Sequence, residues 1–125
     1  MPFTRVDLIQ GKPPEYRATV AEVVYQGLVG ILKAPEGDRF IVIGEHKADN
    51  FVYEPIFLGM KKTPDLIYIQ VTTTVGNTVE QKLAFFRQMA DELNRRLKVR
   101  REDVFTNLVF IKKEDWSFGN GEPWT

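Results

Sequence analysis

Alternating apolar and polar residues along the chain predict two copies of a strand–helix–strand unit. Four segments rich in β-branched and aromatic residues are predicted strands, at about 2–9, 39–45, 66–74 and 104–112. Two longer segments, at about 14–33 and 79–98, carry apolar residues at helical spacing. Because a helix separates the two strands of each unit, we expect those strands to pair in parallel through a right-handed crossover.

Apolar stripes indicate which face of each predicted helix packs on the sheet. The stripe residues are Val20, Val24, Leu28 and Ile31 in the first helix, and Phe86, Met89, Ala90, Leu93 and Leu97 in the second. Thr78 and Gln81 form a capping-box pattern where the second helix begins. Pro13 and Pro14 suit the first turn of the first helix, where a missing N–H costs nothing.

The two units repeat at a constant offset of 65 residues. Identical residues at this offset include Val6 and Val71, Gly11 and Gly76, Glu15 and Glu80, Lys33 and Lys98, Asp38 and Asp103, and Phe40 and Phe105. Two copies indicate a pseudo-symmetric domain rather than a solenoid. We therefore expect a single domain over 1–125, with one repeat at about 2–46, a connection at 47–65, a second repeat at 66–113 and a tail at 114–125.

The predicted fold is a four-stranded α/β (α+β) sheet with both helices on one face. The other face would carry Phe3, Phe40, Val42 and Tyr68. Because a protein in water rarely leaves so large an apolar surface bare, we expect the chain to form oligomers. The connection is too apolar for a flexible linker, so it is expected to pack as a structured segment, with room for a short hairpin.

Composition excludes several functional classes. Seventeen basic residues balance 17 acidic residues, which argues against a nucleic-acid or anionic-membrane partner. The absence of cysteine excludes disulfides, thiol catalysis and Cys-based zinc sites. We see neither a membrane-spanning apolar run nor a secretory signal, and so expect a cytoplasmic protein.

Proline at position 2 is the strongest candidate for chemistry. Removal of Met1 would leave Pro2 with a secondary amine at the N-terminus. An α-amino group ordinarily has a pKa of about 7.7–8.0, and burial lowers the pKa further because it disfavours the charged ammonium. Such an amine acts as a general base when neutral and as a general acid when protonated. Proline is also simply tolerated at the first residue of a strand.

A series of short motifs follows Pro2 in order: Asp38-Arg39-Phe40, Glu45-His46, Leu58-Gly59, Glu80-Gln81-Lys82, Asp103-Val104 and Asp115-Trp116-Ser117-Phe118-Gly119. Over nearly the whole chain this set resembles the tautomerase superfamily, most closely its malonate semialdehyde decarboxylase branch. The resemblance implies a trimer with Pro2 as the catalytic residue. It also implies that Asp38 orients substrate or assists a water, and that Trp116 and Phe118 wall the pocket.

One turn departs from the decarboxylase pattern. Those enzymes place two arginines after the third strand to hold the substrate carboxylate, whereas Thr74 and Asn77 stand nearest those positions here. Neither side chain replaces a bidentate arginine in charge, which counts against malonate semialdehyde decarboxylation. Lys12 stands where oxalocrotonate tautomerase-like members have an arginine, and it is interpreted as a solvated lysine or a point charge.

The leading hypothesis is a homotrimeric, cofactor-independent tautomerase without a metal, acting on small 2-oxo acids or their enols. Pro2 and Asp38 are its catalytic candidates, and Thr74, Asn77, Trp116 and Phe118 its substrate-binding candidates. The alternatives are a hydratase, dehalogenase or decarboxylase that uses cationic proline with Asp38-assisted water, and a non-catalytic trimeric binding scaffold. His46 and Asn107 keep open roles, with a structural hydrogen bond favoured for the histidine.

Overall fold

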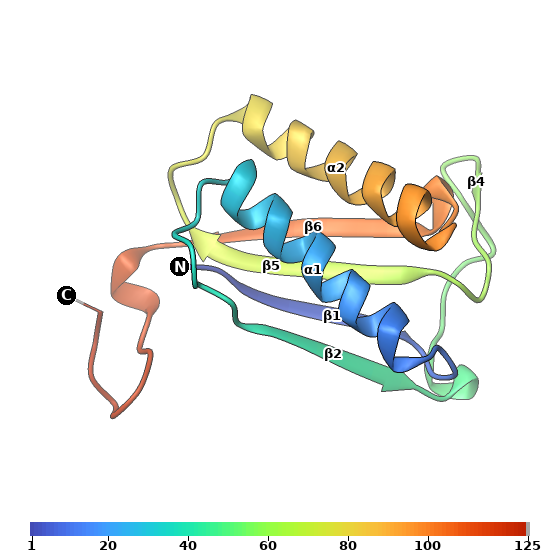
Figure 1. Cartoon of the computed structure of the whole chain (residues 1–125), viewed down its shortest axis with the longest axis horizontal. Coiled ribbons are helices and arrows are strands. Elements are labelled where there is room, and N and C mark those ends of the chain that lie inside the picture. The colour runs from blue at the N-terminus through green and yellow to red at the C-terminus, as the bar shows by residue number, and fades with distance from the viewer. Residues whose placement is uncertain (125) are drawn as a thin grey trace.

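The computed structural model describes residues 1–124. Its main sheet has the strand order β2-β1-β5-β6 (Figure 1). The bounds are Phe3–Ile9 for β1, Ile41–His46 for β2, Ile67–Thr74 for β5 and Val104–Ile111 for β6. Helix α1 (Pro14–Gly30) connects β1 to β2, and helix α2 (Val79–Leu97) connects β5 to β6. The predicted pair of strand–helix–strand units is confirmed.

Strand pairing reproduces the repeat in the sequence. β1 pairs with β2 in parallel, and β5 pairs with β6 in parallel. The two units join through an antiparallel β1–β5 pair, in which Val6 stands opposite Ile69 and Thr4 stands opposite Val71. This antiparallel seam places the N-terminus beside the carboxyl end of β5, because the two strands run in opposite directions.

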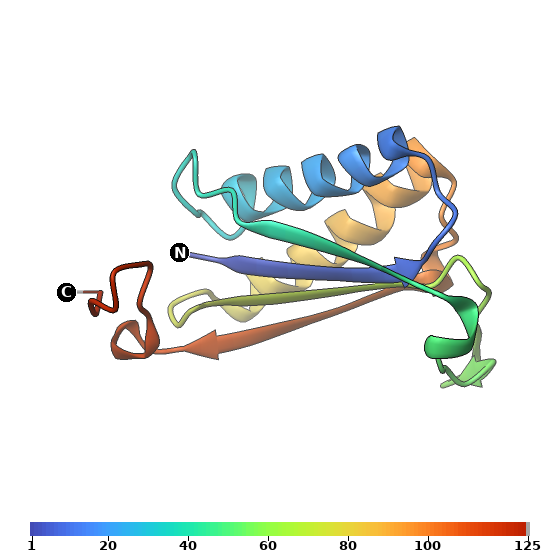
Figure 2. The same ribbon diagram turned by 90° about the horizontal axis from the view of Figure 1, so that it is seen from below.

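Both helices cover one face of the sheet (Figure 2). The core between the helices and the sheet is made of buried residues on strands and helices, among them Val6, Leu8, Val20, Val24, Leu28, Ile67, Ile69, Val71, Phe85, Met89 and Leu93. In the second helix Phe85 is buried, and Phe86 is 37% exposed. The prediction that Phe86 faces the core was therefore wrong: Phe85 packs against Gly27 of α1, where a β-carbon would lie 2.9 Å from its ring.

The ends of the helices follow local backbone rules. Thr78 and Gln81 form the predicted capping box at the start of α2. Both helices end earlier than predicted, at Gly30 rather than Lys33 and at Leu97 rather than Lys98. Lys98 is the C-cap of α2, and its left-handed φ of 60° cannot continue an α-helix. Helix α1 is capped by Ile31 instead, and Lys33, with a φ of 63°, lies further along the loop.

The connection between the repeats packs as structured chain. It contains the short 3-10 helix η1 (Ala48–Asn50) and a hairpin of β3 (Ile56–Phe57) and β4 (Met60–Lys61). Two more 3-10 helices, η2 (Arg101–Asp103) and η3 (Lys113–Asp115), flank β6. The sheet face away from the helices carries exposed Phe3, Val42 and Phe105. The alternation in the sequence predicted the first two of these residues.

The C-terminal tail extends beyond the end of the sheet at which the N-terminus lies (Figures 1 and 2). Its aromatic rings pack on one another: Trp116 and Phe118 stack with centroids 5.2 Å apart, and Trp124 meets Phe118 at 5.4 Å. The backbone N–H of Trp124 donates to the carbonyl of Trp116 at 3.0 Å, which closes the loop. The tail therefore presents a formed aromatic surface beside Pro2.

Candidate active site around Pro2

Pro2 is buried at the start of β1, where two cavities meet. One cavity lies toward the helices and the end of β5, and the other lies toward the C-terminal tail. Met1 also lines both cavities. Met1 is bonded to the nitrogen of Pro2. Removal of Met1 would therefore expose the Pro2 amine to both cavities.

The first cavity, of about 310 Å³, is polar where β5 ends. Thr74 lies at the last position of β5 and Asn77 lies in the following turn, and both line this cavity together with Pro2. Lys33, from the loop after α1, lines it as well. Sequence reasoning did not select Lys33 for the site. The sequence marks Lys33 only through its identity with Lys98 in the repeat. That identity does not tell which of the two lysines lies near Pro2.

Asn77 has a structural role that the sequence did not reveal. Its side-chain Nδ2 donates to the carbonyl oxygen of Leu32 at 2.9 Å and to Oε1 of Gln81 at 3.2 Å. These bonds fix the loop after α1 against the turn before α2. Asn77 therefore shapes the wall of the cavity that Lys33 also lines.

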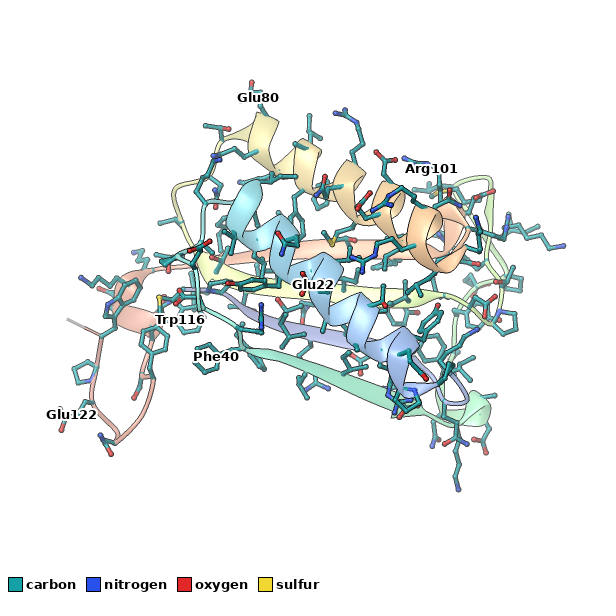
Figure 3. The ribbon with its side chains drawn as sticks, viewed as in Figure 1. Glu22, Phe40, Glu80, Arg101, Trp116 and Glu122 are labelled. Carbon is teal, nitrogen blue, oxygen red and sulfur yellow. The ribbon has the colours of Figure 1, made fainter. Side chains whose placement is uncertain are left out.

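The second cavity, of about 280 Å³, is mainly aromatic. It is lined by Met1, Pro2, Phe3, Phe40, Trp116, Ser117 and Phe118. Figure 3 shows Phe40 and Trp116 at the same end of the sheet. The sequence placed Phe40 on the bare sheet face, and the structure in addition brings it together with the two tail aromatics beside Pro2.

Three of the residues predicted for the site carry buried polar atoms without a hydrogen-bond partner within residues 1–124. These atoms are Oγ1 of Thr74, Oδ2 of Asp38 and Nε1 of Trp116. Buried polar groups are almost always paired in folded proteins, so unpaired ones mark places where a ligand or another subunit can supply the partner. Asp38 lies in the loop between α1 and β2 and lines neither of the two cavities.

The other polar candidates lie elsewhere. His46 ends β2, and its Nε2 lies 2.7 Å from Oδ1 of Asp7, a structural hydrogen bond between neighbouring strands. Asn107 is exposed on the bare sheet face. Lys12 follows the far end of β1 from Pro2 and forms an ion pair with Asp65 at 2.6 Å. None of these three lines a cavity at Pro2.

Two features of residues 1–124 bear on metal ions and membranes as partners. No group of three or more His, Asp or Glu side chains there is placed to hold a metal ion. None of the helices in that range is both long and apolar enough to cross a membrane.

A buried proline at position 2 and a doubled β-α-β sheet together point to the tautomerase class of proteins. Two family models, both described as tautomerase enzyme, match the chain, one over residues 38–119 and the other over residues 2–60. The chain belongs to this tautomerase family.

Individual relatives agree with this assignment. "Probable tautomerase YusQ" of Bacillus subtilis (strain 168) is 37% identical over 121 residues, which cover 97% of this chain and 95% of the relative. Among solved structures, FG41 malonate semialdehyde decarboxylase inhibited by 3-bromopropiolate is 32% identical, with a TM-score of 0.87 over 96% of this chain and 91% of that one. A fused 4-OT symmetric trimer shares the fold at 21% identity, with a TM-score of 0.79 over 97% and 94% of the two chains.

Proposed function

We propose that this chain is a cofactor-independent tautomerase in which Pro2, freed by removal of Met1, is the general base for keto–enol tautomerisation of a small 2-oxo acid. The observation that carries the proposal is the burial of Pro2 at the junction of a polar and an aromatic cavity. A polar cavity suits the carboxylate and enol oxygens of such a substrate, and an aromatic cavity suits its side chain.

The proposed reaction moves one proton. The lone pair of the Pro2 nitrogen takes the proton from the enol hydroxyl, and the C–O bond becomes a carbonyl as the carbon–carbon π electrons move to C3. The protonated amine then returns its proton to C3, which gives the keto acid and restores neutral Pro2. The step balances as an isomerisation and uses neither water nor a cofactor.

Two local features favour this chemistry. Burial of Pro2 between apolar side chains is expected to lower the pKa of its amine, because desolvation disfavours the ammonium form. The buried Oγ1 of Thr74, which has no partner within residues 1–124, is suited to donate a hydrogen bond to the enolate oxygen. Thr74 is therefore proposed as a binding residue, and Asn77 as the residue that positions the cavity wall.

We also propose a homotrimer. The exposed apolar residues Phe3, Val42 and Phe105 lie on the sheet face that no helix covers, and a fused 4-OT relative of the same fold forms a symmetric trimer. Packing of these faces in an assembly would remove the apolar surface from water. Sedimentation velocity of the purified chain tests this proposal, and a monomer at micromolar concentration would contradict it.

The test of catalysis combines intact mass with two changes at the N-terminus. Pro2→Ala keeps an amine but removes the ring, and an alanine inserted before Pro2 keeps the ring but converts its nitrogen into an amide. We expect the insertion to lower kcat/KM for ketonisation of phenylenolpyruvate by roughly 10²- to 10⁴-fold, the usual contribution of a general base. Unchanged activity in the inserted chain would exclude Pro2 as the base.

A second candidate reaction is water addition or decarboxylation with cationic Pro2 and Asp38. It is favoured by the buried, unpartnered Oδ2 of Asp38 and by the 32% identity to a malonate semialdehyde decarboxylase. The pH dependence of kcat/KM separates the two reactions. A rate that rises through the pKa of the amine supports a base, and a rate that falls through it supports an acid.

A further inference from the structure

The loop between α1 and β2 forms part of both cavities at Pro2. In its first half, Ala34 and Pro35 line the polar cavity, and near its end Phe40 lines the aromatic cavity. Figure 1 shows this loop passing the N-terminus on its way from α1 to β2. The position of the loop therefore decides where one wall of each cavity stands relative to Pro2.

Main-chain hydrogen bonds attach the two ends of this loop to the rest of the domain. The N–H of Ala34 donates to the carbonyl oxygen of Leu28 at 2.9 Å. At the other end, the N–H of Thr4 donates to the carbonyl oxygen of Phe40 at 3.0 Å. Between these points, the main-chain hydrogen bonds of residues 35–39 are made within the loop itself. Such local bonds shape the turn but do not attach its middle to the domain.

Tyr25 of α1 attaches the middle of the loop through two contacts of different kinds. Its phenol oxygen accepts a hydrogen bond from the N–H of Gly37 at 2.9 Å. The guanidinium carbon of Arg39 lies 3.9 Å from the centre of the same ring, which is a cation–π contact. We call these three residues the Tyr25 clamp. One side chain thus holds the loop on either side of Asp38.

Asp38 lies between the two loop residues that Tyr25 holds. Its Oδ2 is buried and has no hydrogen-bond partner within residues 1–124. An ionised carboxylate is more stable in water than buried without a partner, so a loose loop would let this side chain turn outward. The Tyr25 clamp therefore opposes the movement of this carboxylate as well as that of the cavity walls.

The second repeat shows that the fold itself does not require the clamp. At the offset of 65 residues, Ala90 stands at the position of Tyr25, and Val104 stands at the position of Arg39. Neither side chain can form a hydrogen bond or a cation–π contact. The second repeat nevertheless forms the same strand–helix–strand unit. The clamp is therefore a feature of the repeat that carries Pro2, and not of the β-α-β unit as such.

Resting on the proposed function, we infer that Tyr25 is a positioning residue for the Pro2 site. Tyr25 lines neither cavity and acts through the loop, by holding Pro35 and Phe40 as walls against the substrate. Pro2 directly precedes β1, whose place is fixed by pairing with two strands. Loss of the clamp should therefore weaken substrate binding and leave the proton transfer unchanged, which raises KM at nearly constant kcat.

The kinetic test compares two substitutions of Tyr25 in the Met1-processed protein, with phenylenolpyruvate as the substrate. Tyr25→Leu removes both contacts and should raise KM by roughly 10-fold, whereas Tyr25→Phe keeps the ring and should raise it by roughly 2- to 5-fold. The matched control is Tyr16→Leu, because Tyr16 also lies in α1 under a cation, with Nζ of Lys12 at 5.1 Å, and lines neither cavity. Its KM should stay that of the wild type.

A second measurement does not depend on turnover. Trp116 lines the aromatic cavity together with Phe40, and its indole N–H gives one of only two tryptophan side-chain signals in a proton–nitrogen NMR spectrum. Trp124→Phe assigns that signal. It should shift in both Tyr25 variants and stay in place in Tyr16→Leu.

Two results would overturn the inference. One is an unchanged Trp116 signal in the Tyr25 variants, and the other is a fall in kcat at constant KM, which indicates only a smaller fraction of folded enzyme. Failure of the proposed function would instead appear as full activity of the chain with alanine inserted before Pro2. That result leaves the NMR comparison intact, so the two failures are distinguishable.

Discussion

Asp38 and Asp103 occupy equivalent positions in the two repeats, yet only the Asp103 carboxylate is bonded. Asp103 is fully buried, and its two oxygens accept hydrogen bonds from the backbone N–H and the hydroxyl of Thr63, with Arg100 at 3.7 Å. Oδ2 of Asp38 is buried without a partner within residues 1–124. The same residue type is therefore part of the scaffold in one repeat and open to a ligand in the other.

This asymmetry predicts different effects on stability. Asp103→Ala should lower the free energy of unfolding by roughly 2–4 kcal/mol, because it removes a fully buried side chain and leaves the half-buried N–H of Thr63 without its partner. Asp38→Ala should change it by less than about 1 kcal/mol, since no hydrogen bond of its Oδ2 is lost. Urea unfolding of both variants provides the comparison, and a larger loss for Asp38→Ala would contradict it.

Substitution of Asp38 also distinguishes the two candidate reactions of Pro2. If Pro2 acts as a base without water, Asp38→Asn should keep kcat/KM for ketonisation of phenylenolpyruvate within a few-fold of the wild type. If Asp38 activates water for hydration or decarboxylation, the variant should lose roughly 10²-fold or more in those reactions. Parallel kinetics on both substrate classes give the answer, with Asp103→Asn as the control for structural damage.

A glycine in α1 sets the distance between the helices. A β-carbon at Gly27 would lie 2.6 Å from Cε of Met89 and 2.9 Å from the ring of Phe85, both in the core. We expect Gly27→Ala to cost about 1–3 kcal/mol of stability through overpacking. Gly30→Ala, where a β-carbon meets nothing within 4 Å, should be neutral or stabilising by up to about 1 kcal/mol. Thermal unfolding of the two variants checks the difference.

The Lys12–Asp65 ion pair predicts a loss of stability at alkaline pH. The hydrogen bond that Nζ of Lys12 donates to Oδ1 of Asp65 raises the pKa of Lys12 above its ordinary value of 10.5, although burial opposes the shift. Because the folded pKa lies above the unfolded one, the contribution is complete below pH 10.5 and is lost as pH rises through the folded pKa.

A double-mutant cycle measures this contribution. For a pair this exposed, Lys12→Met and Asp65→Asn should show a coupling of roughly 0.2–1 kcal/mol at pH 8 that disappears in a series toward pH 12. The Arg95–Glu92 pair is the control, because a guanidinium keeps its charge over the same range, so its coupling should not change with pH. A pH-independent Lys12–Asp65 coupling would contradict the assignment.

The sequence by itself determined the strand and helix segments, the repeat, the capping box at Thr78 and the candidacy of Pro2. These features depend on local periodicity and turn chemistry, which a single chain displays directly. It did not determine where each helix ends, because the cap at Ile31 and the left-handed φ of Lys98 are not visible in the apolar pattern. Nor did it distinguish Phe85 from Phe86, because the contact of α2 with Gly27 decides how that helix is rotated.

Only the tertiary structure decided what surrounds Pro2. Lys33 and Phe40 both lie in the loop between α1 and β2, and each lines a different cavity beside Pro2. The tail that brings Trp116 lies more than a hundred residues away in sequence. Such neighbours come together because the antiparallel β1–β5 seam places the chain start at the end of β5. Local pattern fixes elements, whereas the site depends on contacts between residues distant in the chain.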